Sequence, residues 1–159
     1  MIIRKAIKDD LETVASIYNQ YLGVSTMDLD PLTGDDFSAL LHAESEKLFV
    51  GCLDDTIIGW SAIKLYSKKQ GYQKCCETST YIFKQFLGKG YGTQFKKFIL
   101  EECKNLGYTH ILARIFSKNK KSISYNLKLG YEIVGVQKDI GYVNGEYLDV
   151  TIMQYNFKK

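Results

Sequence analysis

A glycine-rich segment, residues 87–93 with the sequence Leu-Gly-Lys-Gly-Tyr-Gly-Thr, most constrains how this chain can fold. It follows an expected strand at 75–83 and precedes an expected helix that begins at Gly90 and ends before Gly107. The first turn of a helix has free amides and the positive end of the helix dipole, so this junction favours anions. Glycines at alternate positions also let a phosphate approach the backbone. The segment therefore predicts a strand–loop–helix unit that binds a pyrophosphate-bearing ligand.

Three classes of ligand site use such a loop, and its spacing separates them. A P-loop requires Gly-Lys followed by Ser or Thr, but Lys89 is followed by Gly90. A dinucleotide site requires Gly-x-Gly-x-x-Gly early in a βαβ unit, whereas this loop reads Gly-x-Gly-x-Gly past the middle of the chain. A coenzyme A loop has the core Gln/Arg-x-x-Gly-x-Gly/Ala, which the segment fits except at Leu87. A glycine-rich turn without a ligand is the remaining alternative.

Periodicity divides the rest of the chain into alternating strands and helices. The first helix, capped by Asp9 or Asp10, has the apolar stripe Leu11, Val14, Tyr18 and Tyr21, and Thr33 caps a second helix. The helix from Gly90 presents apolar side chains on one face and Lys96, Lys97, Glu101 and Lys104 outside. Tight turns are expected at Asp54-Asp55 and Asn144-Gly145. The expected strands are 2–6, 48–53, 56–66, 75–83, 110–116, 131–140 and 147–155, with a short helix at 118–129.

The resulting order, β-α-α-β-β-β-α-β-α-β-β, predicts an α/β (α+β) fold. Three antiparallel neighbours precede a β-α-β crossover, so the sheet is expected to be mixed. The 159 residues fit one domain spanning 1–159. No internal repeat or linker interrupts it.

Composition excludes several classes of function. The formal net charge is only +3 and the lysines are scattered, which argues against nucleic acid as the main partner. No apolar run is long enough for a membrane span, and the N-terminus does not read as a signal peptide. The four cysteines and two histidines lack zinc spacing, so no metal is expected. Four reduced thiols indicate a cytoplasmic protein.

Five stretches in order carry a resemblance to a known family. They are the first helix with the loop after it (17–21 and 25–26), the central strand (77–82), the glycine loop, residues 119–131 and the hairpin at 145–150. Together they resemble the GNAT superfamily of N-acetyltransferases, and within it the phosphinothricin (methionine sulfoximine) N-acetyltransferase group. The resemblance covers nearly the whole chain. It implies a mixed, mostly antiparallel sheet of about seven strands, splayed at strands 4 and 5, with about four helices.

The resemblance also implies how acetyl-CoA would bind. The pantetheine arm would pair with the splayed central strand, and the glycine loop would take the pyrophosphate. Asn119 and Ser122 would either contact the coenzyme or cap the following helix, and both interpretations stay open. The cofactor-binding residues implied are Thr80, Tyr81, Ile82, Gly88, Lys89, Gly90, Tyr91, Gly92, Thr93, Asn119 and Ser122.

Acetyl transfer to an amine requires a base, because an alkyl amine is mostly protonated near neutral pH. Glu77 is the candidate: a carboxylate in a strand expected to be largely buried beside the cleft. The alternative is a carboxylate on a solvated strand edge. A backbone N–H of the central strand can meet the developing oxyanion. Many superfamily members use a tyrosine as general acid, but Asn126 stands at that position and Tyr125 precedes it, which places a tyrosine acid in doubt.

The resemblance places the acceptor near Lys69 and Tyr72, with Lys69 where an arginine is usual. Leu148 replaces a histidine before Asp149. The leading hypothesis is an N-acetyltransferase for the amine of a small amino-acid-like substrate, acting by direct attack in a ternary complex and as a homodimer. The alternatives are an acetyltransferase for a polyamine, an aminoglycoside or a protein N-terminus, and a non-catalytic coenzyme A-binding relative.

Overall fold

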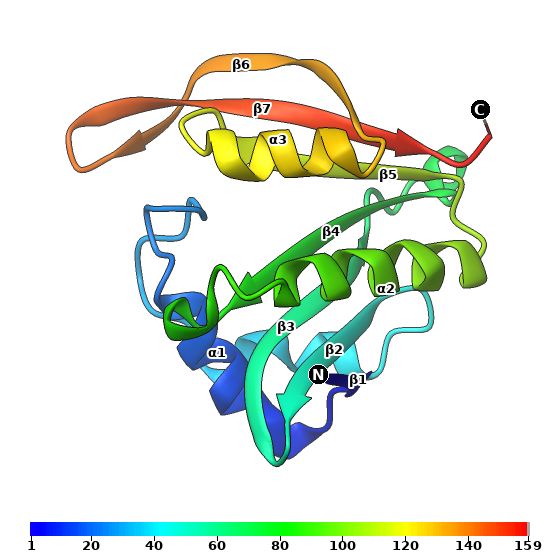
Figure 1. Cartoon of the computed structure of the whole chain (residues 1–159). Helices are drawn as coiled ribbons and strands as arrows, with labels where there is room; N and C mark the ends of the chain where they lie inside the picture. Colours follow the sequence, from blue (N-terminus) through cyan, green and yellow to red (C-terminus); the bar gives the residue numbers. More distant parts are fainter. Residues whose placement is uncertain (159) are drawn as a thin grey trace.

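The computed structural model describes residues 1–158 and contains one seven-stranded sheet. The strands stand in the order β1-β2-β3-β4-β5-β7-β6, and every neighbouring pair is antiparallel except β4 and β5 (Figure 1). The mixed sheet predicted from the element order is therefore confirmed. The strands are β1 (Ile2–Lys5), β2 (Lys47–Leu53), β3 (Thr56–Leu65), β4 (Cys75–Ile82), β5 (His110–Phe116), β6 (Glu132–Val143) and β7 (Glu146–Asn156).

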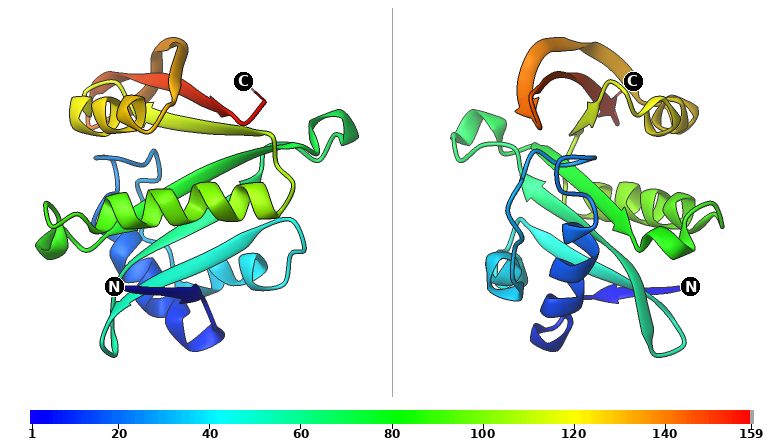
Figure 2. Two further views of the ribbon diagram at one scale, coloured as in Figure 1. Left: turned by 45° about the vertical axis from the view of Figure 1, so that its right-hand side comes forward. Right: turned by 90° about the vertical axis from the view of Figure 1, so that its left-hand side faces the viewer.

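Helices cover both faces of the sheet (Figure 2). On one face lie α1 (Leu11–Asn19) and the 3-10 segment Gly34–Leu41, and on the other lies α2 (Tyr91–Asn105). The helix expected after Thr33 is thus 3-10 rather than α. The third α-helix, α3 (Lys120–Lys128), lies beside β5.

Alternate residues of the sheet belong to two separate cores. Val50 and Trp60 pack with α1, whereas Phe49 and Ile63 pack with Ile99 and its neighbours on α2. This period of two is what a strand buried on both faces requires. The sheet is therefore held from both sides, and β4 at its centre is fixed in position.

β4 and β5 are paired over only their first residues. Residues 75–77 of β4 pair with 110–112 of β5, and no pairing of the two strands continues beyond Glu77 and Leu112. The strands then diverge, with α2 beside β4 and α3 beside β5 (Figure 1). This is the splay that the resemblance implied, and it leaves residues 78–82 without a strand neighbour on that side.

Two hairpin turns have the backbone conformation that their sequences predicted. Asn144 and Gly145 both have positive φ, 50° and 81°, as a two-residue turn between twisted strands requires. Asp54, in the turn between β2 and β3, has a φ of 50°. Turn chemistry therefore fixed where these strands begin and end.

Candidate functional site

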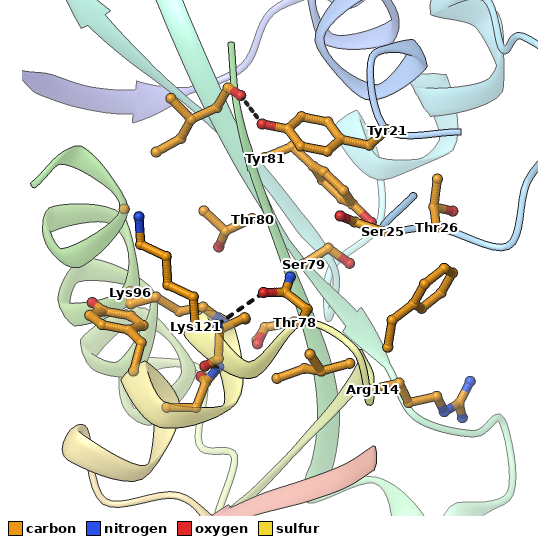
Figure 3. A pocket seen from close by; sticks show the side chains of 18 of the residues that line it. Tyr21, Ser25, Thr26, Thr78, Ser79, Thr80, Tyr81, Lys96, Arg114 and Lys121 are labelled. Atoms are coloured by element: carbon orange, nitrogen blue, oxygen red, sulfur yellow. Dashed lines mark hydrogen bonds between the residues drawn. The ribbon is translucent and has the colours of Figure 1, made fainter. Parts of the chain in front are cut away.

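A large cleft, of about 1290 Å³, opens where β4 and β5 diverge. The exposed side of β4 forms its floor, α2 and α3 form one wall, and the segment after α1 forms the other (Figure 3). Lys96 and Lys121 lie on the helix side of β4, whereas Tyr21, Ser25 and Thr26 lie on the opposite side. The cleft thus has a helix side and an opposite side lined by the segment after α1, joined along β4.

The glycine loop closes the cleft at the N-terminus of α2. Gly90 immediately precedes the helix and has a φ of 84°, a conformation that favours glycine. The amides of Thr93 and Gln94 donate to the Gly90 carbonyl, which leaves the amides of Tyr91 and Gly92 as the free donors of the first turn. The geometry is that of an anion site at a helix N-terminus.

Most of the residues predicted to bind the coenzyme line this cleft. The exception is Lys89, whose Nζ lies 5.3 Å from the centre of the Phe86 ring. Leu87, which stands where glutamine or arginine is usual, lines the cleft and is half exposed. The predicted residues found along the cleft are Thr80, Tyr81, Ile82, Gly88, Gly90, Tyr91, Gly92, Thr93, Asn119 and Ser122.

Two of these positions have structural partners already. The Asn119 side chain accepts a hydrogen bond from the Ser122 amide at 3.1 Å, so Asn119 caps α3. The Tyr21 hydroxyl donates to the Ile82 carbonyl, so that carbonyl is engaged from the side opposite the helices. Capping and lining the cleft are therefore compatible at Asn119.

Glu77 lies at the point of divergence, in the last β4 residue that pairs with β5. Its side chain is 27% exposed and its Oε2 lies 3.5 Å from Nη2 of Arg114. Both side chains line the cleft. Glu77 is thus less buried than expected, and it faces a cation that the sequence did not reveal.

The position usual for a tyrosine acid lines the cleft but holds an amide, which has no acidic proton to donate. Asn126 is fully buried and its Nδ2 donates to the Ser122 carbonyl at 2.8 Å. Its Oδ1 has no hydrogen-bond partner among residues 1–158. Tyr125 lines the cleft beside Thr93, and burial raises the pKa of its hydroxyl. A phenol held protonated in this way does not favour proton donation at neutral pH.

Lys96 corrects the assignment made from helix periodicity. It was expected on the outer face of α2, yet it is partly buried and lines the cleft. One residue along a helix rotates a side chain by about 100°, so Lys96 turns from the sheet-facing Phe95 toward α3 rather than toward solvent. Burial lowers the pKa of Lys96 to about 8.

The side of the cleft opposite the helices holds residues that the sequence assigned to the core. Tyr18 and Tyr21 were predicted as part of an apolar stripe, and both line the cleft around Tyr81, at ring distances of 5.0 and 5.3 Å. The Tyr18 hydroxyl bonds Thr26 and Asp28, and burial, with Asp28, raises its pKa to about 12. A tyrosine at helical spacing fits a core position and a cleft position equally well, so the sequence alone did not distinguish the two.

Lys69 and Tyr72, predicted to hold the acceptor, lie outside the cleft. Tyr72 is 49% exposed and packs edge-on against Tyr66 at 5.2 Å, and Tyr66 reaches the rim. Among residues 1–158 no group of metal-ligating side chains and no helix long and apolar enough to cross a membrane is present.

Comparison with known proteins identifies relatives of this chain in both sequence and structure. Residues 3–152 match the Acetyltransferase (GNAT) domain family. The chain is 31% identical to YwnH of Bacillus subtilis over 96% of this chain and 97% of that protein. It is 28% identical to the L-methionine sulfoximine/L-methionine sulfone acetyltransferase of Pseudomonas aeruginosa, over 97% and 93%. A phosphinothricin acetyltransferase from Sinorhizobium meliloti, solved in complex with AcCoA, superposes with a TM-score of 0.90 at 25% identity, over 98% and 87%.

Proposed function

Because the chain belongs to the GNAT acetyltransferase family, we propose that it acetylates the primary amine of a small amino-acid-like substrate, of the phosphinothricin or methionine sulfoximine type. The chain is an acyltransferase, and acetyl-CoA is its cosubstrate. One observation carries the proposal: the glycine loop, the unpaired side of β4 and Glu77 all open on one cleft.

The residues of the cleft fit the coenzyme in two places. The free amides of Tyr91 and Gly92 suit a pyrophosphate, and a Cβ built at Gly88 or Gly90 meets no atom within 4 Å, so the loop surface is open to one. Residues 78–82 of β4 present backbone groups on the splayed side, where an amide-bearing arm can pair with Thr80 and Tyr81. We propose that Ile82, Lys89, Asn119 and Ser122 also contact the coenzyme.

Glu77 and Arg114 support an amino acid as the acceptor. A carboxylate and a guanidinium 3.5 Å apart match the ammonium and carboxylate of an α-amino acid, each group meeting its opposite charge. Glu77 takes a proton from the ammonium, directly or through water, and thereby frees the lone pair for attack on the thioester carbonyl. A backbone N–H on the splayed side of β4 meets the oxyanion that develops. Tyr72 contributes at the rim through its contact with Tyr66, and Lys69, on the same loop, supplies positive charge near that rim.

The alternatives differ in what they require of these two residues. A polyamine has no carboxylate, so its acetylation would not need Arg114. A non-catalytic coenzyme A-binding relative would need neither Arg114 nor the base. An amino-acid acceptor needs both.

Three further features of the whole protein belong to the proposal. We infer one domain over residues 1–159, a homodimer, and a cytoplasmic location, the last from four cysteines that form no disulfide. The dimer is supported by β6, whose side chains are exposed on both faces over most of its length.

The test is a thiol-release assay with acetyl-CoA and a panel of amines. The panel contains methionine sulfoximine, methionine sulfone, phosphinothricin, common amino acids, spermidine, an aminoglycoside and an N-terminal peptide. We expect turnover on the amino-acid analogues and loss of most of it in Arg114→Gln. Turnover on spermidine alone, unchanged in Arg114→Gln, would refute the acceptor class.

A further inference from the structure

Three lysines without a salt bridge among residues 1–158 line the cleft, and Lys96 is the partly buried one, whereas Lys121 and Lys128 are exposed. Lys96 projects from the second turn of α2 into the cleft and is partly buried there. No salt bridge among residues 1–158 involves it. An ammonium removed from water without an anion is costly, so a lysine kept in such a place calls for a partner supplied by the ligand.

Tyr131 shows where along the cleft this ammonium lies. The Lys96 Nζ is 5.9 Å from the centre of the Tyr131 ring. The Tyr131 amide donates to the Asn126 carbonyl at 3.0 Å. The Tyr131 hydroxyl lies beside the Thr78 hydroxyl, which opposes the rise in pKa that burial causes. Lys96 and Thr78 therefore both lie beside the Tyr131 side chain, and the Asn126 backbone holds the Tyr131 amide.

Thr78 places this cluster at the point where β4 and β5 diverge. It is the residue that directly follows the last β4–β5 pair, and Glu77, the proposed base, precedes it. The thioester must lie within reach of an amine that Glu77 activates, so its sulfur lies at this apex. Asn126 Oδ1 is buried without a hydrogen-bond partner among the described residues, and Thr78 Oγ1 is buried with the Tyr131 hydroxyl beside it. The apex is buried, polar and incompletely satisfied, as a site that receives a polar reacting group should be.

We propose that the Lys96 ammonium is the general acid that protonates the departing coenzyme thiolate, in place of the tyrosine that this chain lacks at position 126. This inference rests on the proposed acetyl transfer. As the carbon–sulfur bond breaks, its electron pair passes to sulfur. A proton moves from Nζ to that sulfur, which leaves a neutral lysine and a thiol. The acceptor nitrogen loses two protons, one from the ammonium before attack and one from the adduct after the carbon–nitrogen bond forms, and Glu77 passes each in turn to solvent. Nζ regains one proton from solvent, so one proton is released per turnover.

The electrostatics of the cluster suit this transfer. The titratable groups near Nζ are Tyr131 beyond α3 and Cys103 on α2. Burial raises the pKa of Tyr131, so this phenol is neutral at pH 7. Burial lowers the pKa of Lys96 to about 8, close to that of a thiol, roughly 8.5. Donor and acceptor are then nearly matched, whereas an ordinary lysine near 10.4 would be a weaker acid. Lys96 is still mostly protonated at pH 7, so the acid form is present.

Lys96→Met and Lys96→Arg test the proposal, with Lys97→Met on the exposed face of the same helix as control. We expect Lys96→Met to lower kcat about 100-fold with little change in the Kd of acetyl-CoA. Wild-type kcat should fall above pH 8 as the acid form is lost, and Lys96→Met should lack this fall. Lys96→Arg keeps the charge but holds its proton too tightly, so its kcat should also be low.

A second measurement does not depend on the acceptor. The absorbance of the coenzyme A thiolate, titrated in the binary complex, should give a lower thiol pKa in wild type than in Lys96→Met. Equal values, or full kcat in either Lys96 variant, would overturn the proposal, as would an acetyl group found on Lys96 itself by peptide mass spectrometry. If wild type acetylates no amine but the thiol titration differs, the acceptor proposal fails and the placement of Lys96 stands.

Discussion

Glu77 owes its position to the register of two strands rather than to its neighbours in sequence. It pairs with Leu112 across the only parallel contact in the described sheet, and Arg114 follows two residues later on the same face of β5. The carboxylate is therefore held at the apex by backbone pairing on both sides of β4. A base in this place is positioned before any substrate binds, which is what efficient proton transfer requires.

Replacement of Glu77 by glutamine removes the base and keeps the shape of the side chain. We expect kcat/KM at pH 7 to fall about 100-fold in the thiol-release assay. The deficit should narrow at alkaline pH, because the acceptor amine then loses its proton to solvent.

Glu101→Gln, on the exposed face of α2, serves as the matched control and should leave the rate unchanged. A Glu77→Gln enzyme with wild-type kcat/KM throughout the pH range would remove Glu77 as the base.

The limits of prediction at this scale have a geometric origin. The glycine loop and Glu77 were identifiable because their residue types and spacing relate directly to chemistry. Arg114 was not, since its contact with Glu77 exists only through the β4–β5 register. Lys96 was misplaced because helix periodicity separates the sheet-facing side from the rest, and α2 has a second packed side.

At the scale of elements, the loop and α2 act as one unit. The positive φ of Gly90 turns the chain so that the first amides of α2 point into the cleft. Turn residues and apolar periodicity predicted all seven strands and the three α-helices to within a few residues. They could not separate the 3-10 segment at Gly34–Leu41 from an α-helix, because one or two turns present the same apolar pattern in both.

Replacement of Gly90 by valine tests this unit. A side chain in the left-handed region costs about 1–2 kcal/mol, and the added branches occupy the open space where the pyrophosphate is expected. We expect the Kd of acetyl-CoA, measured by calorimetry, to rise at least about tenfold.

Gly145→Val in the β6–β7 turn provides the comparison. Gly145 has a φ of 81° and equally open space around its Cβ position, so the strain is similar but lies far from the loop. It should lose a similar free energy of unfolding and bind acetyl-CoA as wild type does. Equal binding by both variants would refute the assignment of the loop.

At the scale of the whole molecule, the two halves of the sheet are covered unequally. The half from β1 to β4 is packed between helices, whereas β6, at the other edge, is exposed along most of its length. Its exposed apolar side chains, with one from β7, are Ile133, Val134, Val136, Ile140, Tyr142 and Tyr147. An edge strand this apolar invites pairing or packing with another chain unless an interface covers it.

A second copy of this chain is the occupant that we propose for this edge, and Val136→Glu tests it. Val136 is 46% exposed and pairs with Thr151 in the register of β6 and β7, so a carboxylate there is solvated in the monomer and buried in a dimer. We expect sedimentation velocity to give a dimer for wild type and a monomer for the variant.

Ile2→Glu, which changes a residue 72% exposed on β1 at the opposite edge, should stay dimeric. Because Val136 does not line the cleft, although Gln137 and Ile140 of β6 do, the monomeric variant should still bind acetyl-CoA. A wild-type monomer, or a Val136→Glu dimer, would exclude β6 as the interface.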